Sequence, residues 1–154
     1  MARDIGLLRK AVKLMPPISL KGMADFDQVL DELWNVTREE MNFLTEASNM
    51  EEFARRNADV VYVRTPKLYQ EYTTMHVLVM EYIEGPVIDD KEKLLAGGYD
   101  LEEIGIKLID NYIKQVMEDG FFHADPHPGN VKIQDGKIVW IDMGMMGRLT
   151  ERDK

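Results

Sequence analysis

Three side chains that can offer oxygen ligands follow one another in the second half of the 154-residue chain. Asp125 and Asn130 belong to the stretch His123-Ala-Asp-Pro-His-Pro-Gly-Asn130, and Asp142 follows a pair of apolar segments. The Asn130 amide and the Asp142 carboxylate are hard ligands, of the kind that Mg²⁺ binds together with water and phosphate oxygens. Asp125 precedes them, where a carboxylate can accept a proton from an attacking hydroxyl or water. The residue types and their spacing therefore indicate a site for phosphate and a divalent ion.

The two histidines of this stretch allow another interpretation. His123, Asp125 and His127 alternate along the chain, as the ligands of a zinc ion could. Because Pro126 and Pro128 interrupt any regular strand and no fourth ligand is evident, we do not favour zinc. We expect His123 to support the loop through hydrogen bonds, and we leave His127 either exposed or near the site.

A hairpin is the element that must bring Asn130 and Asp142 together. The segments Val131–Gln134 and Lys137–Ile141 flank Asp135-Gly136, one of the strongest short hairpin signals. Since a hairpin folds the chain back on itself, Asp142 is expected to return close to Asn130.

A helix from Leu101 to about Asp119 is expected before this stretch. Asp100 is a suitable N-cap with Glu103 at the capping-box position, and Gly120 ends the helix. The expected core face of this helix consists of Ile104, Leu108, Tyr112, Val116 and Met117.

The first half of the chain is expected to begin with helices. Residues 3–15 have amphipathic spacing, and residues 25–56 lack Gly and Pro and carry apolar side chains every three or four positions. We predict a short basic amphipathic helix and then one long helix, and we leave open an interruption of the long helix near Thr37. On the long helix Asn42, Glu46 and Asn49 share one face, which we expect to be its solvated side.

The middle of the chain is expected to supply strands. Leu68–Tyr72 and Met75–Ile83 are predicted as two strands joined at Thr73-Thr74. The second of them is nearly continuously apolar, which is typical of a strand that is covered on both faces. A short acidic helix over residues 89–96 is expected to follow.

The composition excludes several classes of function. A formal net charge of -9 argues against a nucleic-acid partner, because binding to phosphate backbones requires clustered Lys and Arg. The absence of cysteine excludes disulfides and thiolate metal sites, and it fits a reducing cytosol. No run approaches the roughly 18 apolar residues that span a bilayer, so we expect no transmembrane segment. The expected location is cytoplasmic or peripheral to the cytoplasmic membrane.

Several segments resemble one known family. His123–Asn130, read as His-x-Asp-x-x-x-x-Asn, and Asp142–Gly144 resemble the catalytic loop and metal-binding turn of protein kinases. The complete amino-acid sequences of these two segments resemble the ABC1/UbiB/ADCK family of atypical kinases, which is associated with ubiquinone biosynthesis. Leu78–Gly85 is similar to the strand and hinge of that family, and Glu40–Asn49 is similar to its helix C. The resemblance implies an α+β, partly protein-kinase-like fold with ATP and Mg²⁺ as cofactors.

The resemblance also implies roles for individual residues. Asp125 would be the catalytic-loop aspartate, and Asn130 and Asp142 would be the Mg²⁺ ligands. Glu46 would be the helix-C glutamate that pairs with a strand lysine. The residues that would bind the adenine are the gatekeeper Met80 and the hinge residues Glu81, Tyr82 and Ile83.

The chain departs from the family pattern in several places. The Glu-x-Asp motif of the family stands here as Glu40-Met41-Asn42, and Met143 replaces the aromatic residue of Asp-Phe-Gly. No Val-Ala-x-Lys strand, Ala-rich nucleotide loop or Lys-x-Gly-Gln segment occurs in the chain, nor do the usual C-terminal helices. We therefore expect an internal piece of the kinase fold, with residues 1–84 as a partial N-lobe and residues 85–154 as a partial C-lobe. Without the loop and lysine that hold phosphates, this chain alone should bind ATP weakly and be poorly active.

Three hypotheses of function remain. The first is a fragment of an ABC1/UbiB-type kinase or ATPase that binds Mg-ATP and supports ubiquinone biosynthesis. Its partners would be a nucleotide and, through parts outside this chain, a membrane or a lipid-like quinone precursor, with no nucleic acid. The second is a small-molecule phosphotransferase of the aminoglycoside-kinase kind, against which Glu40–Asn49 argues. The third is a non-catalytic nucleotide-binding pseudokinase scaffold, which Asn42 and the missing strands favour.

Overall fold

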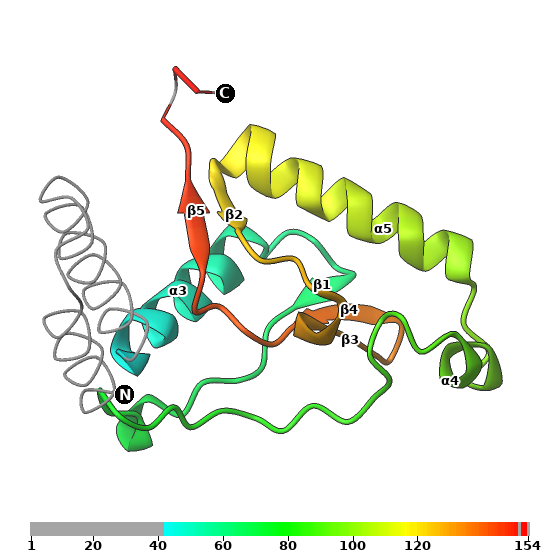
Figure 1. Ribbon diagram of the computed structural model, residues 1–154, viewed down its shortest axis with the longest axis horizontal. Coiled ribbons are helices and arrows are strands. Elements are labelled where there is room, and N and C mark those ends of the chain that lie inside the picture. The colour runs from blue at the N-terminus through cyan, green and yellow to red at the C-terminus, as the bar shows by residue number, and fades with distance from the viewer. Residues whose placement is uncertain (1–41, 151, 154) are drawn as a thin grey trace, which may run out of the picture. The chain divides into compact units, whose positions relative to one another are not determined.

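The computed structural model describes residues 42–150 and 152–153, so the expectations for residues 3–15, for Glu40 and for the helix before residue 42 lie outside it. The described residues form a mixed α+β fold, which confirms the predicted fold class (Figure 1). The helical elements are α3 (Phe43–Arg56), η1 (Gln70–Tyr72), α4 (Lys91–Ala96), α5 (Leu101–Ile113), η2 (Lys114–Asp119) and η3 (Pro128–Asn130). The strands are β1 (Val63–Arg64), β2 (Phe121–His123), β3 (Val131–Gln134), β4 (Lys137–Trp140) and β5 (Met146–Arg148).

Helix α3 begins where a polar side chain can cap it. Asn42 has an extended backbone, with φ of -100° and ψ of 91°, and its side-chain oxygen accepts a hydrogen bond from the Leu44 amide. Such a residue satisfies one of the free N–H groups at a helix N-terminus. The prediction of one helix over residues 25–56 is therefore wrong at Asn42, because an N-cap residue is not itself helical. The interruption that was considered near Thr37 lies outside the described residues.

The predicted hairpin is confirmed. Strands β3 and β4 pair antiparallel from Val131 opposite Trp140 to Gln134 opposite Lys137. Asp135 and Gly136 form the turn with positive φ angles of 53° and 73°, which this type of tight hairpin turn requires. Strand β1 extends the sheet by pairing parallel to β4, so the strand order is β1-β4-β3.

The two strands of a second sheet flank the candidate site in the sequence. Strands β2 and β5 pair antiparallel, with His123 opposite Met146. The Ala124 amide donates a hydrogen bond to the Met145 carbonyl at 3.0 Å, which continues this pairing toward the loop. The stretch that carries Asp125 and the turn that carries Asp142 are thus joined through one ladder.

The helix before the site differs from its prediction in its last turns. Asp100 caps α5 as expected by accepting from the Glu102 and Glu103 amides. From Lys114 the helix continues as the π-helical η2 to Asp119, and Gly120 then ends it in the left-handed conformation. The wider π turn changes which side chains face inward.

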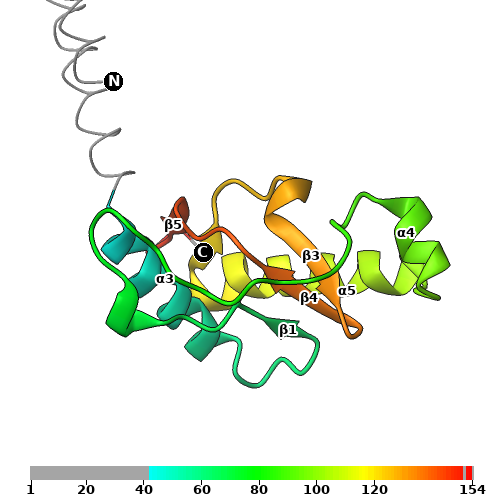
Figure 2. The ribbon, with the colours of Figure 1, turned by 90° about the horizontal axis from the view of Figure 1, so that it is seen from below.

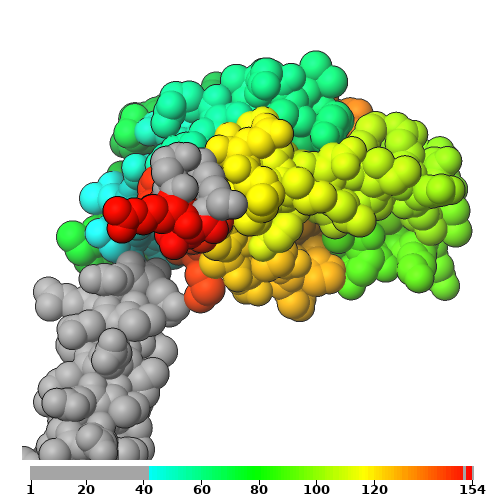
Figure 3. Space-filling model, turned by 90° about the horizontal axis from the view of Figure 1, so that it is seen from above, coloured from blue at the N-terminus to red at the C-terminus, as the bar shows by residue number. Residues whose placement is uncertain are grey.

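The expected core face of this helix is accordingly wrong in part. Met117 is 54% exposed, whereas Asn111 and Gln115 are buried. Ile104, Leu108 and Tyr112 pack against the core as predicted. The opposite side of α5 carries exposed apolar side chains at Ile106, Ile109 and Ile113, and Figure 3 shows α5 along one face of the molecule.

The two strands predicted for the middle of the chain do not form as regular strands. Isolated bridges join Leu68 to Met80 and Thr74 to Val77, and η1 occupies part of the first segment. Val77 is 51% exposed, so the second segment is not covered on both faces. Among the described residues no third strand pairs with this ribbon, and a two-stranded ribbon is only marginally stable.

The chain between this ribbon and α4 runs alongside the hairpin (Figure 2). The Ile133 amide donates to the Pro86 carbonyl and the Ile88 amide to the Val131 carbonyl, both at 3.0 Å. Gly85 has a φ of 145°, and a Cβ placed there would lie 2.2 Å from the Ile133 carbonyl oxygen. Only glycine fits this close approach.

The core lies between α3, α5 and the β1-β4-β3 sheet. Phe53 and Trp140 are in ring contact within it, with centroids 6.2 Å apart, and both side chains are almost fully buried. Within the described residues, no helix combines the length and the apolar character that crossing a membrane requires.

Candidate nucleotide and metal site

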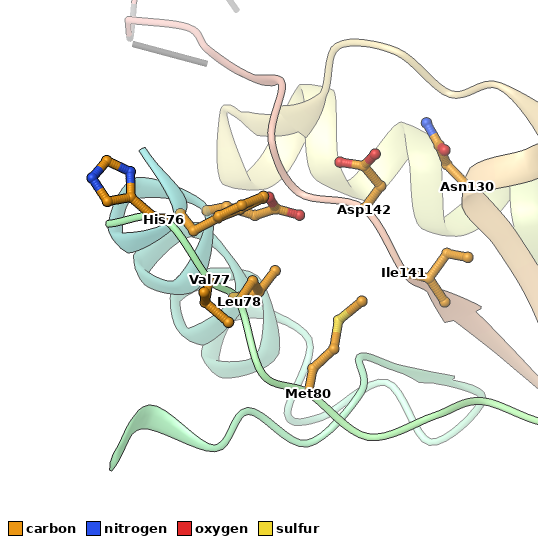
Figure 4. A pocket seen from close by; sticks show the side chains of 9 residues that line it. His76, Val77, Leu78, Met80, Asn130, Ile141 and Asp142 are labelled. Atoms are coloured by element: carbon orange, nitrogen blue, oxygen red, sulfur yellow. The ribbon is translucent and has the colours of Figure 1, made fainter. Parts of the chain in front are cut away.

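A cleft of about 580 Å³ brings the predicted metal ligands and the predicted gatekeeper together. Asn130, Ile141 and Asp142 line one side of it, and Val77, Leu78 and Met80 line the other, as Figure 4 shows. Phe43, Glu46 and His76 complete the lining. The cleft therefore has a polar end and an apolar end, an arrangement that is typical of small-molecule sites.

Asn130 is held so that its oxygen remains available. Its side-chain nitrogen donates to the Asp125 carbonyl at 3.1 Å, which fixes the orientation of the amide. The Ile141 amide donates to the Asn130 carbonyl at 3.0 Å, and this bond brings the two ends of the hairpin together as the sequence predicted. The Asn130 amide oxygen accepts no hydrogen bond from the described residues.

Asp142 is anchored by one of its two carboxylate oxygens. Oδ1 accepts a hydrogen bond from the Gly144 amide at 2.9 Å, and Oδ2 makes no hydrogen bond with the described residues. A Cβ placed at Gly144 would lie 3.2 Å from Asp142 Oδ1 and 3.8 Å from Glu46 Oε2. Two carboxylates thus approach the same small region beside Gly144.

His123 supports the loop, as expected. Its Nδ1 accepts from the Asp125 amide at 3.2 Å, so Nε2 carries the proton and donates to the Asp142 carbonyl at 2.5 Å. The ring stacks on Trp140 with centroids 5.0 Å apart. Burial lowers the pKa of His123, although the nearby Asp142 carbonyl and the Asp142 and Asp125 charges raise it. The neutral ring links the loop of Asp125 to the turn of Asp142.

Asp125 has a fixed backbone and a free side chain. Its carbonyl accepts from the His127 amide at 2.7 Å as well as from Asn130. Its carboxylate is exposed and makes no hydrogen bond or ion pair with any described residue. The loop therefore presents this group to solvent, and Asp125 does not line the cleft. His127, which was left open, is also exposed, and its Nδ1 accepts from the Gly129 amide at 3.0 Å.

Helix α3 holds the turn after Asp142 through the face that was expected to be solvated. The Asn49 side chain donates to the Met143 carbonyl at 2.9 Å, and Glu46 Oε1 accepts from the Met143 amide at 3.4 Å. Burial raises the pKa of Glu46, and the Asp142 charge raises it further, while the bond from Met143 acts in the opposite direction. The expectation of a solvated face is wrong here, because both side chains reach the backbone of a buried residue.

The predicted hinge segment, Glu81–Ile83, follows the cleft-lining Met80 directly. Glu81 forms a two-pronged ion pair with Arg64, at 2.9 and 3.1 Å. Tyr82 is 80% exposed, whereas Ile83 is 4% exposed. Met80 lines the cleft, whereas Glu81, Tyr82 and Ile83 are not among its lining residues. The role of these four residues in binding adenine stays a prediction.

Sequence reasoning missed a buried polar network behind the loop. The Asn111 side-chain oxygen accepts from Trp140 Nε1 at 3.0 Å and from Gln115 Nε2 at 2.8 Å. Asn111 donates to the Asn57 oxygen at 2.7 Å, and Gln115 accepts from the His123 amide at 3.1 Å. The only sequence signal was a polar side chain every three or four positions on a helix, which is also the pattern of a solvated face.

The donor set fits Mg²⁺ better than a metal that needs a full set of protein ligands. No group of three or more His, Asp or Glu side chains that could hold a metal ion occurs within residues 42–150 and 152–153. Asn130 and Asp142 each offer one side-chain oxygen that has no hydrogen-bond partner among the described residues. Mg²⁺ commonly accepts one or two such ligands and completes its shell with water and phosphate.

Comparison with known proteins identifies the family. The model of the ABC1 atypical kinase-like domain matches residues 1–154, the whole chain. The chain belongs to this family. The family resemblance of the catalytic-loop sequence is therefore confirmed.

Relatives of this ABC1 domain come from bacteria and plants. It is 41% identical over 151 residues to a Clostridium pasteurianum protein described as an uncharacterized protein in the hydrogenase 1 5' region. It is 35% identical over 151 residues to the chloroplastic protein ACTIVITY OF BC1 COMPLEX KINASE 8 of Arabidopsis thaliana. These matches cover 98% and 96% of this chain but only 28% and 20% of the relatives. The chain thus spans about a quarter of their length.

A solved structure supports the fold of the ABC1 domain. The complex of Rv3197 with erythromycin from Mycobacterium tuberculosis matches it with a TM-score of 0.66 and 25% identity. The match covers 94% of this chain and 36% of that protein. Family and fold agree on a kinase-like α+β domain, whereas the division at residues 84 and 85 stays a prediction.

Proposed function

We propose that the cleft binds ATP as its magnesium complex and that the chain carries the metal-binding part of an ATP-dependent kinase or ATPase. The observation that carries the proposal is that Asn130 and Asp142 both line the polar end of the cleft, each with one side-chain oxygen that no described residue engages. Membership of the ABC1 atypical kinase-like family supports the choice of nucleotide.

Different residues of the chain would bind the metal ion, the purine ring and the acceptor. Asn130 and Asp142 would hold Mg²⁺, which supplies positive charge against the phosphates. Val77, Leu78 and Met80 offer apolar surface to a purine ring. The exposed carboxylate of Asp125 would accept the proton of an acceptor hydroxyl or water. Glu46 and Asn49 keep the Asp142 turn against α3 through the Met143 backbone.

The wider role that we propose is support of isoprenoid-quinone biosynthesis, including that of ubiquinone. This role is supported by the resemblance of the catalytic-loop sequence to the ABC1/UbiB group of the family. This part of the proposal concerns a whole protein that contains such a domain, because the chain spans about a quarter of the length of its relatives.

Titration with Mg-ATP, followed by NMR of the backbone amides, tests the proposal. Because weak binding is expected, the titration should reach about 10 mM nucleotide, where a millimolar Kd is measurable. We expect shifts that concentrate on the cleft and a Kd that requires Mg²⁺. Asp142→Asn should weaken the Mg²⁺-dependent binding at least about tenfold, because it removes a charged metal ligand.

Asp135→Asn is the matched control, since it makes the same change at the far end of the same hairpin. Asparagine tolerates the positive φ of this position, so the turn and the affinity should be preserved. Equal affinity of the chain and Asp142→Asn would contradict the assignment of the metal site. Nucleotide binding without any turnover, measured in a longer protein that also contains the phosphate-binding loop and lysine, would favour the pseudokinase scaffold over the kinase or ATPase.

A further inference from the structure

The helical segment before the site binds both backbone groups of His123. Gln115 Oε1 accepts a hydrogen bond from the His123 amide, and the Tyr112 hydroxyl donates to the His123 carbonyl, both at 3.1 Å. Gln115 is fully buried, and Tyr112 is partly buried. The ring of His123 in turn donates to the Asp142 carbonyl. Two side chains of one helical segment are thus linked to the Asp142 turn through a single histidine.

The pairing of β2 with β5 explains why His123 needs these two partners. The chain around β5 bonds to the Gly120 carbonyl and accepts from the Ala124 amide, which lie on one edge of β2. In an antiparallel pair the N–H and C=O groups of alternate residues point toward the partner strand, so both groups of His123 point away from β5. Among the described residues no strand pairs with that other edge of β2. Gln115 and Tyr112 take the place of a strand there.

The π-helical turn of η2 is stabilised by an ion pair next to Gln115. Lys114 and Asp119 are five positions apart, which is the spacing of π-helical hydrogen bonds. Lys114 Nζ bonds to both carboxylate oxygens of Asp119 at 3.0 Å, and both side chains are largely buried. Lys114 also donates to the carbonyl of Arg56, the last residue of α3, at 2.9 Å. These contacts favour the π-helical register in which Gln115 faces His123.

We propose that Gln115 and Tyr112 are positioning residues for the metal ligand Asp142. By binding both backbone groups of His123, they fix the ring that holds the Asp142 carbonyl, and with it the place of the Asp142 carboxylate. Neither residue lines the cleft. The inference rests on the proposed magnesium site and adds how its charged ligand is positioned before the ion binds. A preorganised ligand binds more tightly, because less ordering accompanies binding.

The first test measures how much Mg²⁺ improves ATP binding, as the ratio of the Kd values for ATP without and with the ion, by amide NMR of the 154-residue chain. Gln115→Met removes the acceptor at similar side-chain length, and Tyr112→Phe removes only a hydroxyl group. Each should lower the ratio about fivefold, which corresponds to one lost hydrogen bond, and leave the Kd for ATP without Mg²⁺ unchanged. Tyr112→Phe is the smaller change and is expected to fold even if Gln115→Met does not.

The second test needs no nucleotide. The proton on His123 Nε2 is buried and hydrogen-bonded, so it should exchange slowly with water and give its own NMR signal. Gln115→Met and Tyr112→Phe should speed this exchange at least about fivefold. Gln115→Glu should restore slow exchange at about pH 6, because burial keeps the new carboxyl group protonated. A protonated carboxyl group can accept from His123 and donate to Asn111, as the Gln115 amide does.

Val63→Ala is the matched control, because it removes buried apolar volume from β1 and alters no hydrogen bond to His123. It should lower the free energy of unfolding but leave the Kd ratio and the proton exchange unchanged. The inference would be overturned if Gln115→Met and Tyr112→Phe kept the ratio and the exchange rate of the chain, or if Val63→Ala changed both equally. Failure of the unmodified chain to bind Mg-ATP would overturn the proposed function, whereas the proton exchange would still decide whether Gln115 and Tyr112 hold the ring that contacts Asp142.

Discussion

The side chain of Asn111 joins three parts of the molecule that are far apart in the sequence. It bonds to Asn57 at the end of α3, to Trp140 of β4 and to Gln115 of η2. Because the Trp140 ring nitrogen can only donate, the Asn111 oxygen must face it, and this fixes the direction of every bond in the network. The network ends at the amide of His123, whose ring reaches Asp142. It supports the candidate site from within the core.

Replacing Asn111 should be costly. Asn111→Leu would leave the Trp140 nitrogen, the Gln115 nitrogen and the Asn57 oxygen buried without partners. Each such group costs about 1–3 kcal/mol, so we expect a loss of about 3 kcal/mol or more in the free energy of unfolding. Urea unfolding followed by tryptophan fluorescence would measure it.

The neighbouring Asp110 provides the control for this prediction, since it lies on the same helix and is exposed. Asp110→Leu should change the free energy of unfolding by no more than about 0.5 kcal/mol. If the two variants were equally stable, the network would not be the support that the geometry indicates.

Sequence reasoning succeeded for some residues and failed for others for a physical reason. Asn130 and Asp142 could be brought together because a tight hairpin dictates its own register. Asn111 and Gln115 could not be recognised, because burial of an amide depends on partners from β4, β2 and α3 that no local pattern reveals. Glu46 and Asn49 were assigned to a solvated face for the same reason.

At the scale of elements, an ion-pair cluster connects α3 to β5. Glu52 of α3 accepts from Arg56 at 2.7 Å and from Arg148 of β5 at 2.6 Å. Both guanidinium groups also lie over the Phe121 ring, with distances to the centroid of 5.4 and 4.4 Å. The strand that follows the Asp142 turn is thereby held against the helix that carries Glu46.

The contribution of this cluster to the free energy of unfolding should depend measurably on pH. The hydrogen bond from Arg148, followed by that from Arg56, lowers the pKa of Glu52 from its ordinary value of 4.5 to about 2. Because the folded pKa is depressed, the stabilisation is complete above pH 4.5 and is lost as the pH falls toward 2. Glu52→Gln should therefore cost about 1 kcal/mol at neutral pH, and progressively less below pH 4.5.

Urea unfolding at a series of pH values would check this, with Glu51→Gln as the control. Glu51 is the exposed neighbour on the same helix and has no bonded partner within the described part of the chain. A stability difference between the chain and Glu52→Gln that stayed constant down to pH 3 would show that the carboxylate charge is not what binds β5 to α3.

Elements with strong local signals were predictable, and those that depend on neighbours were not. The hairpin turn, the Asp100 cap and the Gly120 stop were all correct because each rests on the conformation of a few adjacent residues. The segment Met75–Ile83 was assigned to a covered strand on its apolar residues alone. A strand needs partners along its edges, and within the described part of the chain this segment forms only two isolated bridges.

At the scale of the whole molecule, the two sides of the cleft come from different parts of the chain, and each part is held in place by its own contacts. Its apolar side belongs to the ribbon of residues 77–80, which leads into the hinge segment tied to the sheet by Arg64 and Lys132. Its polar side belongs to the hairpin ends, which are held by His123 and by α3. A metal-bound nucleotide is therefore expected to contact both sides of the cleft at once.

Paramagnetic broadening by Mn²⁺ tests this central claim most directly, because Mn²⁺ can replace Mg²⁺ at oxygen ligands and broadens NMR signals only close to where it binds. With ATP present, trace Mn²⁺ should broaden the amide signals of Asn130 and of residues 141–144, and it should leave those of α4 sharp. Asp142→Asn should abolish the selective broadening. Broadening that spared residues 130 and 141–144, or that persisted unchanged in Asp142→Asn, would contradict the assignment of the cleft as a metal–nucleotide site.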